Sequence, residues 1–207
     1  MYTPPAFRDD DRHSLLATIR ATRLANFVTM TEDGILATPL PLYLDESEGG
    51  HGVLCGHLAK ANPQCRLPPI GDGLVIFMGP EAYVTPSWYA TKRETGKVVP
   101  TWNYVAVHAY GPVEFFDEPH RLLETVDRLT RLHEEGRDPA WAVDDAPPEF
   151  IQAQLRGIVG LRMPIARIEG KRKMSQNRPA CDRAGVIAGL AASERPTDRE
   201  VATLIVP

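Results

Sequence analysis

The sequence predicts a mostly β fold with flanking helices, arranged as an antiparallel barrel. Between residues 25 and 116, short apolar stretches alternate with turn-forming segments such as residues 32–34 and 45–50. Residues 102–116 (WNYVAVHAYGPVEFF) follow a two-residue period, which is the strongest strand signal in the chain. From residue 118 the apolar residues follow a helical period. Short sequential strands joined by turns favour an antiparallel barrel over alternating strands and helices.

An N-terminal helix is expected over residues 8–22. An acidic triplet precedes three apolar residues that share one helical face, Leu15, Leu16 and Ile19. Carboxylates favour the positive end of a helix and accept hydrogen bonds from its first amides. We therefore expect Asp9 or Asp10 to cap this helix.

The following segments are expected to form short strands. Residues 26–31 and 35–44 predict two strands around a tight turn, and Pro39 and Pro41 then belong at an edge or a bulge, because proline cannot donate to a sheet. Residues 51–64 predict a strand that runs into one helical turn stopped by Pro63. Two further strands are expected at residues 74–79 and 82–86, with an excursion at residues 88–100 before the long alternating run.

The C-terminal half adds helices and a late pair of strands. A helix over residues 118–136 is predicted by Pro119 in its first turn, by Gly136 at its end, and by an apolar stripe consisting of Leu122, Leu123, Val126, Leu129 and Leu132. A shorter helix is expected at residues 150–155 and a strand pair at residues 157–175. Residues 182–206 are weakly helical. We expect one domain over residues 1–207, with peripheral helices at residues 8–22, 118–136 and 182–206.

Composition limits the kind of partner. The chain has 207 residues and a formal net charge of -4, which gives no global attraction for nucleic acid or an anionic membrane. Direct DNA binding is therefore not expected, although a local basic patch remains open. No apolar run approaches the roughly 20 residues that a membrane helix needs. Three widely spaced cysteines and a polar N-terminus indicate the cytoplasm.

The common catalytic and metal-binding motifs are absent from the sequence. It contains no glycine-rich dinucleotide or phosphate loop, no HExxH and no GxSxG. The six histidines do not follow a zinc-binding spacing, so no metal site is predicted. No nucleophile, acid and base form a recognisable set, so no catalytic residue is predicted and enzymatic activity is left open.

Three polar stretches are candidates for ligand binding. In residues 56–62 (GHLAKAN), a cation, an amide and an imidazole follow a strand and are suited to a phosphate, or they form only a polar turn. In residues 97–104 (KVVPTWNY), Asn103 can donate and accept toward a flavin edge while Trp102 covers the ring, or Trp102 fills the core. Residues 169–178 (EGKRKMSQNR) are a basic stretch that is either a solvated turn or a phosphate contact.

The chain resembles the PaiB-like family of FMN-binding negative transcriptional regulators over nearly its whole length. The resemblance rests on MYTPPAF, ATPLPL, GHLAKANPQ, LVIFMGPEAYVTPSWY, GKVVPTWNYVAVHAYG, EGKRKMSQNR and DRAGVIAGL. It implies a split β-barrel of the pyridoxamine-phosphate-oxidase type, a homodimer, and FMN in the groove between subunits. The positions that the resemblance places near flavin are Thr38, His57, Lys60, Asn62, Trp102, Asn103, Lys173, Ser175 and Gln176.

The sequence differs from the family pattern at Pro39, Cys65, Glu81 and Arg172. Each difference removes an aromatic or imidazole group, and Glu81 adds a negative charge that disfavours a nearby phosphate. Two functions are therefore considered. The first is a homodimeric FMN-binding regulator in which flavin-dependent redox activity is an open possibility. The second is a non-catalytic regulator that has lost FMN and binds another small ligand or a protein.

Overall fold

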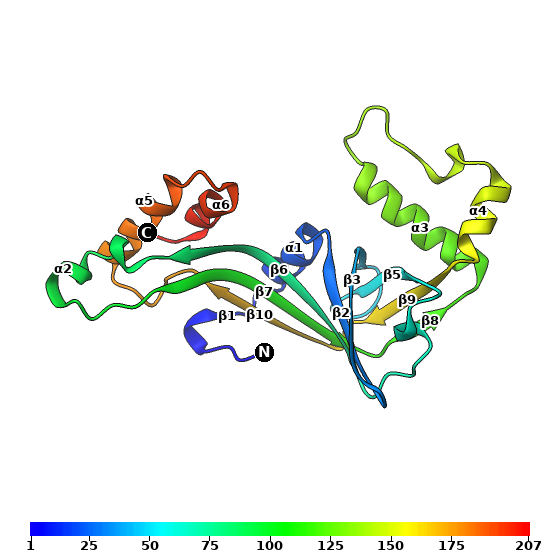
Figure 1. The fold of residues 1–207 in the computed structure, drawn as a ribbon, viewed down its shortest axis with the longest axis horizontal. Coiled ribbons are helices and arrows are strands. Elements are labelled where there is room, and N and C mark those ends of the chain that lie inside the picture. The colour runs from blue at the N-terminus through cyan, green and yellow to red at the C-terminus, as the bar shows by residue number, and fades with distance from the viewer. The chain divides into compact units, whose positions relative to one another are not determined.

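The computed structural model describes residues 1–207 and divides into two compact units (Figure 1). Unit 1 comprises Met1–Ala21, Met78–Val107 and Glu169–Pro207. Unit 2 comprises Thr22–Phe77 and His108–Ile168. The expectation of a single domain over residues 1–207 stays a prediction.

Unit 1 is built on a sheet whose neighbouring strands run in the order β1-β10-β7-β6. The strands are β1 (Arg8–Asp9), β10 (Arg167–Lys173), β7 (Thr101–Gly111) and β6 (Gly73–Val84). The chain crosses between the units within β6, β7 and β10. β1 pairs antiparallel with β10, with Arg8 opposite Lys171.

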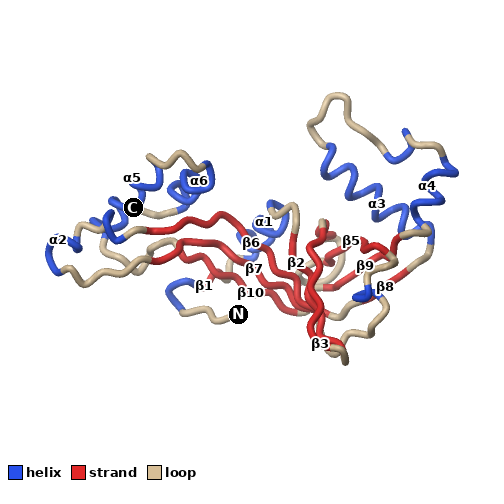
Figure 2. Tube along the Cα trace, in the orientation of Figure 1, coloured by secondary structure: helices blue, strands red, loops and turns tan.

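The helices of unit 1 contribute to its core together with the strands. They are η1 (Pro5–Phe7), α1 (Arg12–Ala21), η3 (Pro86–Trp88), α2 (Thr91–Thr95), α5 (Ala180–Ala191) and α6 (Pro196–Leu204). α5 and α6 lie side by side near the C-terminus (Figures 1 and 2). Their apolar residues pack with those of β6 and β7 in one cluster that includes Ala82, Val84, Val105, Val186, Leu190 and Val201. This burial of apolar area is the main source of stability for helices too short to persist alone.

Unit 2 contains a hairpin and a second sheet. β2 (Ala25–Thr31) and β3 (Gly34–Leu40) form the hairpin, and β2 also pairs with the first half of β6, where Phe27 lies opposite Val75. The second sheet has the order β4-β5-β9-β8, formed by β4 (Leu42–Asp45), β5 (Val53–Ala59), β9 (Ile158–Pro164) and β8 (Glu114–Phe116). The remaining elements of unit 2 are η2 (Pro63–Cys65), α3 (Pro119–Glu134), η4 (Val143–Asp145) and α4 (Pro148–Leu155).

α3 confirms the helix predicted over residues 118–136. Leu122, Thr125 and Leu129 are its buried residues, and the helix contacts β5 and β9. Leu123, which was expected in the apolar stripe, is exposed. Gly136 follows the helix with φ of 80°, a left-handed conformation that glycine adopts without strain. Arg128 bonds to Asp45, which joins the outer face of α3 to β4.

Several local predictions were wrong. The N-terminal helix begins at Arg12, and its cap is Asp11, whose carboxylate accepts from the amides of His13 and Ser14 at 3.3 Å and 3.1 Å. Asp9 instead lies in β1. Pro63 begins the helical turn η2 and does not stop one, since proline at a first helical position lacks only an amide that would have no partner there.

The strand boundaries also differ at two places. Residues 74–79 and 82–86 were expected as separate strands but form the single strand β6, which continues through Gly79 and Pro80. The long run of residues 102–116 is divided into β7 and β8. At the break, a Cβ on Gly111 would lie 1.9 Å from the carbonyl oxygen of Pro164, so the backbones approach too closely for any larger residue.

Trp88 packs directly on α5 at two glycines. A Cβ on Gly185 would lie 2.0 Å from the carbonyl oxygen of Trp88, and one on Gly189 would lie 2.3 Å from its indole ring. The absence of side chains at these positions lets η3 seat on the helix. Glycine inside a helix is therefore a packing requirement here.

We expect Gly185→Ala to destabilise the protein by about 2 kcal/mol, because the new methyl group overlaps backbone that cannot move cheaply. Without this overlap, replacing glycine by alanine inside a helix would stabilise the protein by roughly 1 kcal/mol. The sign of the change in unfolding free energy therefore separates the steric overlap from the helix propensity. The measurement is the free energy of unfolding in urea. Gly50→Ala, where a Cβ meets nothing within 4 Å, is the control. A stabilised Gly185→Ala protein would contradict the packing argument.

Candidate functional site

Gln64 is the centre of a buried hydrogen-bond network in unit 2. Its side chain is 1% exposed, and its Nε2 donates to Thr29 Oγ1 at 3.0 Å and to two backbone carbonyls. Its Oε1 accepts from Thr38 Oγ1 at 2.6 Å. Asn62 closes the network, donating from Nδ2 to Thr38 at 2.9 Å and accepting at Oδ1 from the Gln64 amide. The network fastens η2 to the β2–β3 hairpin.

Thr38 and Asn62 are therefore two predicted site residues that lie together. The polar side-chain atoms of Thr38 and Asn62 form hydrogen bonds within the protein, because each residue is bonded to the other and to Gln64. Sequence reasoning missed Gln64. Its only signal was a polar residue directly after Asn62 and Pro63, and this pattern is common in exposed turns.

Lys60 lies close in sequence to the Gln64 network, and its side chain extends into solvent. Its backbone amide donates to Gly157, and that of Asn62 donates to Ala59, so these two amides are not free for a phosphate. The Lys60 side chain is 53% exposed, and its Nζ lies 3.9 Å from Asp117 Oδ2. A loose, exposed ion pair of this kind is weak. The Lys60 ammonium is thus available to an anion.

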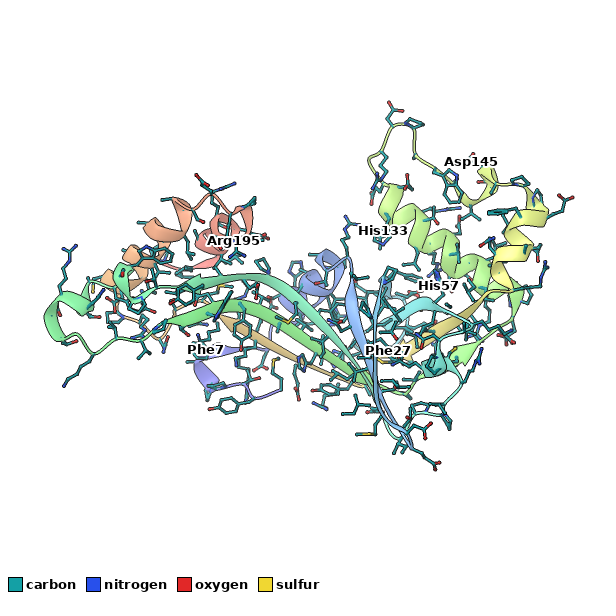
Figure 3. All side chains as sticks on the ribbon, viewed as in Figure 1. Phe7, Phe27, His57, His133, Asp145 and Arg195 are labelled. Atoms are coloured by element: carbon teal, nitrogen blue, oxygen red, sulfur yellow. The ribbon has the colours of Figure 1, made fainter.

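His57 lies on β5, opposite Gly160 of β9 (Figure 3). It lines a cavity with residues of α3, α4 and the segment before α4. Its Nδ1 is buried and has no hydrogen-bond partner. Burial lowers the pKa of the imidazole, so the neutral form is favoured. No hydrogen bond joins His57 to Lys60 or Asn62, so its predicted flavin contact stays a prediction.

Asn103 and Ser175 are brought together in unit 1 from positions far apart in the chain. Asn103 is fully buried, and its Nδ2 donates to Ser175 Oγ at 3.0 Å while its Oδ1 accepts from the same hydroxyl at 3.1 Å. Ser175 has φ of 59°, an uncommon backbone conformation for a residue with a side chain. This pair holds the turn after β10 against β7.

Lys173 is tied to the start of β7. Its Nζ donates to Thr101 Oγ1 and to the carbonyl oxygen of Trp102. Burial, with the charges of Lys171 and Arg178 nearby, lowers the pKa of the ammonium. Gln176 bonds only to its own turn, accepting from the Met174 amide and donating to the Arg172 carbonyl.

Trp102 and Tyr83 form an exposed aromatic pair in unit 1. Each side chain is 44% exposed, and their rings are 5.9 Å apart in an edge-to-face arrangement. The interpretation of Trp102 as a core residue is therefore excluded. Lys171 Nζ lies 5.2 Å from the centre of the Tyr104 ring, two positions along β7. Sequence reasoning did not select Tyr83, whose alternation with Ala82 and Val84 was the available signal.

The four departures from the family pattern lie in different surroundings. Pro39 is exposed on β3, at the edge of its sheet, as predicted. The Cys65 thiol donates to the Asn62 carbonyl at 3.0 Å. Glu81 is exposed on β6. Arg172 contacts Ser14 at 3.2 Å and Asp9 at 3.6 Å, which joins β10 to the start of α1.

No group of three or more His, Cys, Asp or Glu residues is arranged to hold a metal ion. None of the helices combines the length and the apolar character that crossing a bilayer requires. The three cysteines are free thiols.

The architecture is that of known flavoprotein structures. A flavocytochrome from Azotobacter vinelandii aligns with a TM-score of 0.59 at 15% sequence identity, covering 80% of this chain and 69% of that protein. An FAD- and haem-binding protein from Mycobacterium smegmatis aligns with a TM-score of 0.57 at 14% identity, covering 80% and 73%. At such low identity these matches show the fold alone. The fold class is the FMN-binding split barrel, as the sequence predicted.

The relatives by sequence identify the family. Residues 1–167 match the family described as "Putative FMN-binding domain". A Bacillus subtilis protein named protease synthase and sporulation protein PAI 2 is 33% identical over 206 residues, covering 99% of this chain and 96% of the relative. The chain belongs to this FMN-binding domain family and is PaiB-like over its full length.

Replacing the buried amide at the centre of the Gln64 network is expected to be costly. Gln64→Met keeps the side-chain volume but leaves Thr38 and Thr29 without their partner, so we expect a loss of about 3 kcal/mol in the free energy of unfolding. Gln152→Met, on the exposed face of α4, is the matched control and is expected to change stability by no more than about 0.5 kcal/mol. Equal unfolding midpoints for the two variants would show that the network contributes little.

Proposed function

We propose that this protein is a homodimeric FMN-binding regulator of the PaiB type. Membership of the FMN-binding domain family supports the cofactor, and the likeness to flavoproteins supports a fold that accommodates it. The observation that carries the proposal is the exposed Trp102–Tyr83 pair beside the lysines of β10. Flat aromatic surface and cationic side chains are the two features that an isoalloxazine ring with a phosphate requires.

Some of the predicted positions carry groups suited to FMN. Trp102 and Tyr83 offer apolar surface to the ring. In unit 1, Lys173 is proposed as a phosphate contact because it lies in a basic stretch. In unit 2, Lys60 is proposed separately as a phosphate contact because its ammonium is exposed. Asn103 and Ser175 bond to each other, and we propose that they position the β7 and β10 ends. Bound FMN would supply redox chemistry, and no catalytic side chain is proposed.

A regulatory role is proposed by analogy with the Bacillus subtilis relative, whose name refers to protease synthesis and sporulation. The formal net charge of -4 disfavours direct contact with DNA, so we propose that regulation acts through the bound flavin or a protein partner in the cytoplasm. Lys171, Arg172 and Lys173 form a short basic stretch, which offers DNA little positive surface.

The lysines can be tested by comparing FMN with riboflavin, which lacks the phosphate. We expect Lys60→Ala and Lys173→Ala each to weaken FMN binding about tenfold and to change riboflavin binding less than about twofold, since only the phosphate contact is lost. Quenching of flavin fluorescence in a titration measures both affinities. Lys97→Ala, an exposed lysine outside the proposed set, is the control.

The outcomes distinguish the proposal from its alternative. Equal losses for FMN and riboflavin would remove the phosphate role of the lysines. Absence of saturable FMN binding to the native protein would favour a regulator that has lost FMN and binds another ligand. Saturation near one FMN per chain would support the flavoprotein.

The homodimer is a separate prediction. We expect the protein to have about twice the 22.9 kDa chain mass, because the proposed family groove is formed between subunits. Size-exclusion chromatography with light scattering measures the mass directly. A stable monomer that still binds FMN would refute the shared groove while leaving the cofactor in place.

A further inference from the structure

A groove of about 530 Å³ lies between α3, η4 and α4 in unit 2 (Figure 1). Its apolar lining includes Leu123 of α3, Val143 of η4 and Ile151 of α4. Leu123 is 36% exposed, although the helical period places it in the apolar stripe of α3. The fold therefore leaves apolar surface of α3 uncovered in this groove.

Three carboxylates line the same groove, those of Glu124, Asp127 and Asp144. Glu124 and Asp127 each pair with the arginine four positions later on α3, at 3.1 Å and 2.9 Å. Ion pairs of this kind between exposed side chains of one helix are weak, so they leave both carboxylates available to a partner. Asp144 is exposed, and its carboxylate has no hydrogen bond or ion pair within the protein.

The negative charge of the chain is concentrated around this groove. Residues 119–155, from the start of α3 to the end of α4, contain eight Asp or Glu residues and four Arg or Lys residues. This segment therefore has the formal charge of the whole chain, -4, and the rest of the chain is neutral. Arg131 is the only arginine or lysine that lines the groove. A cationic partner is favoured here, and a phosphate is disfavoured.

The dimensions of the groove favour an extended peptide. Its α3 wall runs from His120 to Arg131, about 16 Å at 1.5 Å per residue. A helix of that length, about 10 Å across, would fill about 1,200 Å³, more than twice the 530 Å³ of the groove. An extended chain covers the same length with about five residues. Alternating side chains would point toward the apolar lining, and those between them, if long and basic, would reach the carboxylates.

We propose that this groove docks an extended segment of a partner protein in which arginine or lysine alternates with apolar residues. The apolar side chains cover Leu123 and Ile151, and the cations pair with Glu124, Asp127 and Asp144. None of the positions predicted to contact flavin lines this groove. The inference concerns the protein-partner route of the proposed regulation, and it holds whether or not the protein binds FMN.

The direct probe is the fluorescein-labelled peptide RLRLRLR, titrated into the native protein and followed by fluorescence anisotropy. We expect saturable binding with a Kd on the order of tens of micromolar. The peptide RSRSRSR lacks the apolar side chains and ELELELE lacks the cations, so each is expected to bind at least about tenfold more weakly. Raising the salt from about 0.1 M to about 1 M shortens the screening length from about 10 Å to about 3 Å and is expected to weaken binding of RLRLRLR.

Two pairs of variants locate the binding. Asp144→Lys reverses an unpaired charge in the groove and is expected to weaken RLRLRLR about tenfold. Asp33→Lys, in an exposed turn of unit 2, changes the net charge equally and is expected to alter the affinity less than about twofold. Leu123→Ala removes apolar lining and is expected to weaken binding about fivefold, whereas Leu24→Ala, at a residue that is 60% exposed, is its control.

A third variant is expected to strengthen binding. Arg131 is 78% exposed and pairs with Asp127, so Arg131→Gln removes the arginine of the groove and frees a carboxylate. We expect RLRLRLR to bind about threefold more tightly to this variant. A gain in affinity cannot come from loss of folding, and thermal unfolding of every variant establishes that the weakened ones are folded.

Five results would overturn the proposal. The first is no saturable binding of RLRLRLR to the native protein at millimolar concentration, and the second is equal affinity for RSRSRSR. The third is equal weakening by Asp144→Lys and Asp33→Lys, which would reduce the interaction to net charge. The fourth is displacement of RLRLRLR by FMN, which would assign the groove to the flavin.

The fifth is a change in the amide NMR shifts of Val143 and Asp144 with protein concentration in the absence of peptide, which would assign the groove to a second copy of this chain. The affinities for FMN and riboflavin are measured without the peptide. This inference and the proposed function therefore fail separately.

Discussion

Gln64 donates and accepts in the interior of unit 2 and connects η2 to both strands of the β2–β3 hairpin. Without it, η2 would have few apolar contacts to hold it on the β2–β3 hairpin, because the turn exposes most of its residues. Buried amides are costly unless paired, and here the pairing is complete at both ends of the side chain. The position of the loop that carries Lys60 depends on this network.

Unit 1 also uses hydrogen bonds of buried polar side chains at two places. Asn103 and Ser175 join β7 to the turn after β10, and the buried carboxylate of Asp182 accepts from the Thr91 amide and hydroxyl at 3.0 Å and 2.8 Å. Each pair fixes an irregular segment through hydrogen bonds between polar groups. The side chains left exposed beside these fixed segments are Lys60, Trp102 and Tyr83. They are the groups on which the flavin proposal depends.

Two of the residues that differ from the family pattern have clear partners of their own. Arg172 contacts Ser14 and Asp9, and Cys65 donates to the backbone of its own turn. The loss of an aromatic group at these positions is therefore accompanied by a polar contact within the chain. Glu81 is exposed near Tyr83 on β6 and makes the local surface less favourable for an anion.

The sequence by itself determined the β-rich class, the position of α3 and the resemblance to a family, because periodicity, proline and glycine placement and continuous motifs are local properties. It also placed Lys60 and Trp102 among the candidate ligand contacts. Tertiary structure decided which polar residues form hydrogen bonds within the protein. Asn103 meets Ser175 across 72 positions, and Gln64 meets Thr38 across 26, so neither pairing is visible in any local pattern. The continuity of β6 through Gly79 was likewise decided by packing, because that glycine lies against Val105 of β7. The cavity beside His57 exists only because α3, α4 and β5 meet around it.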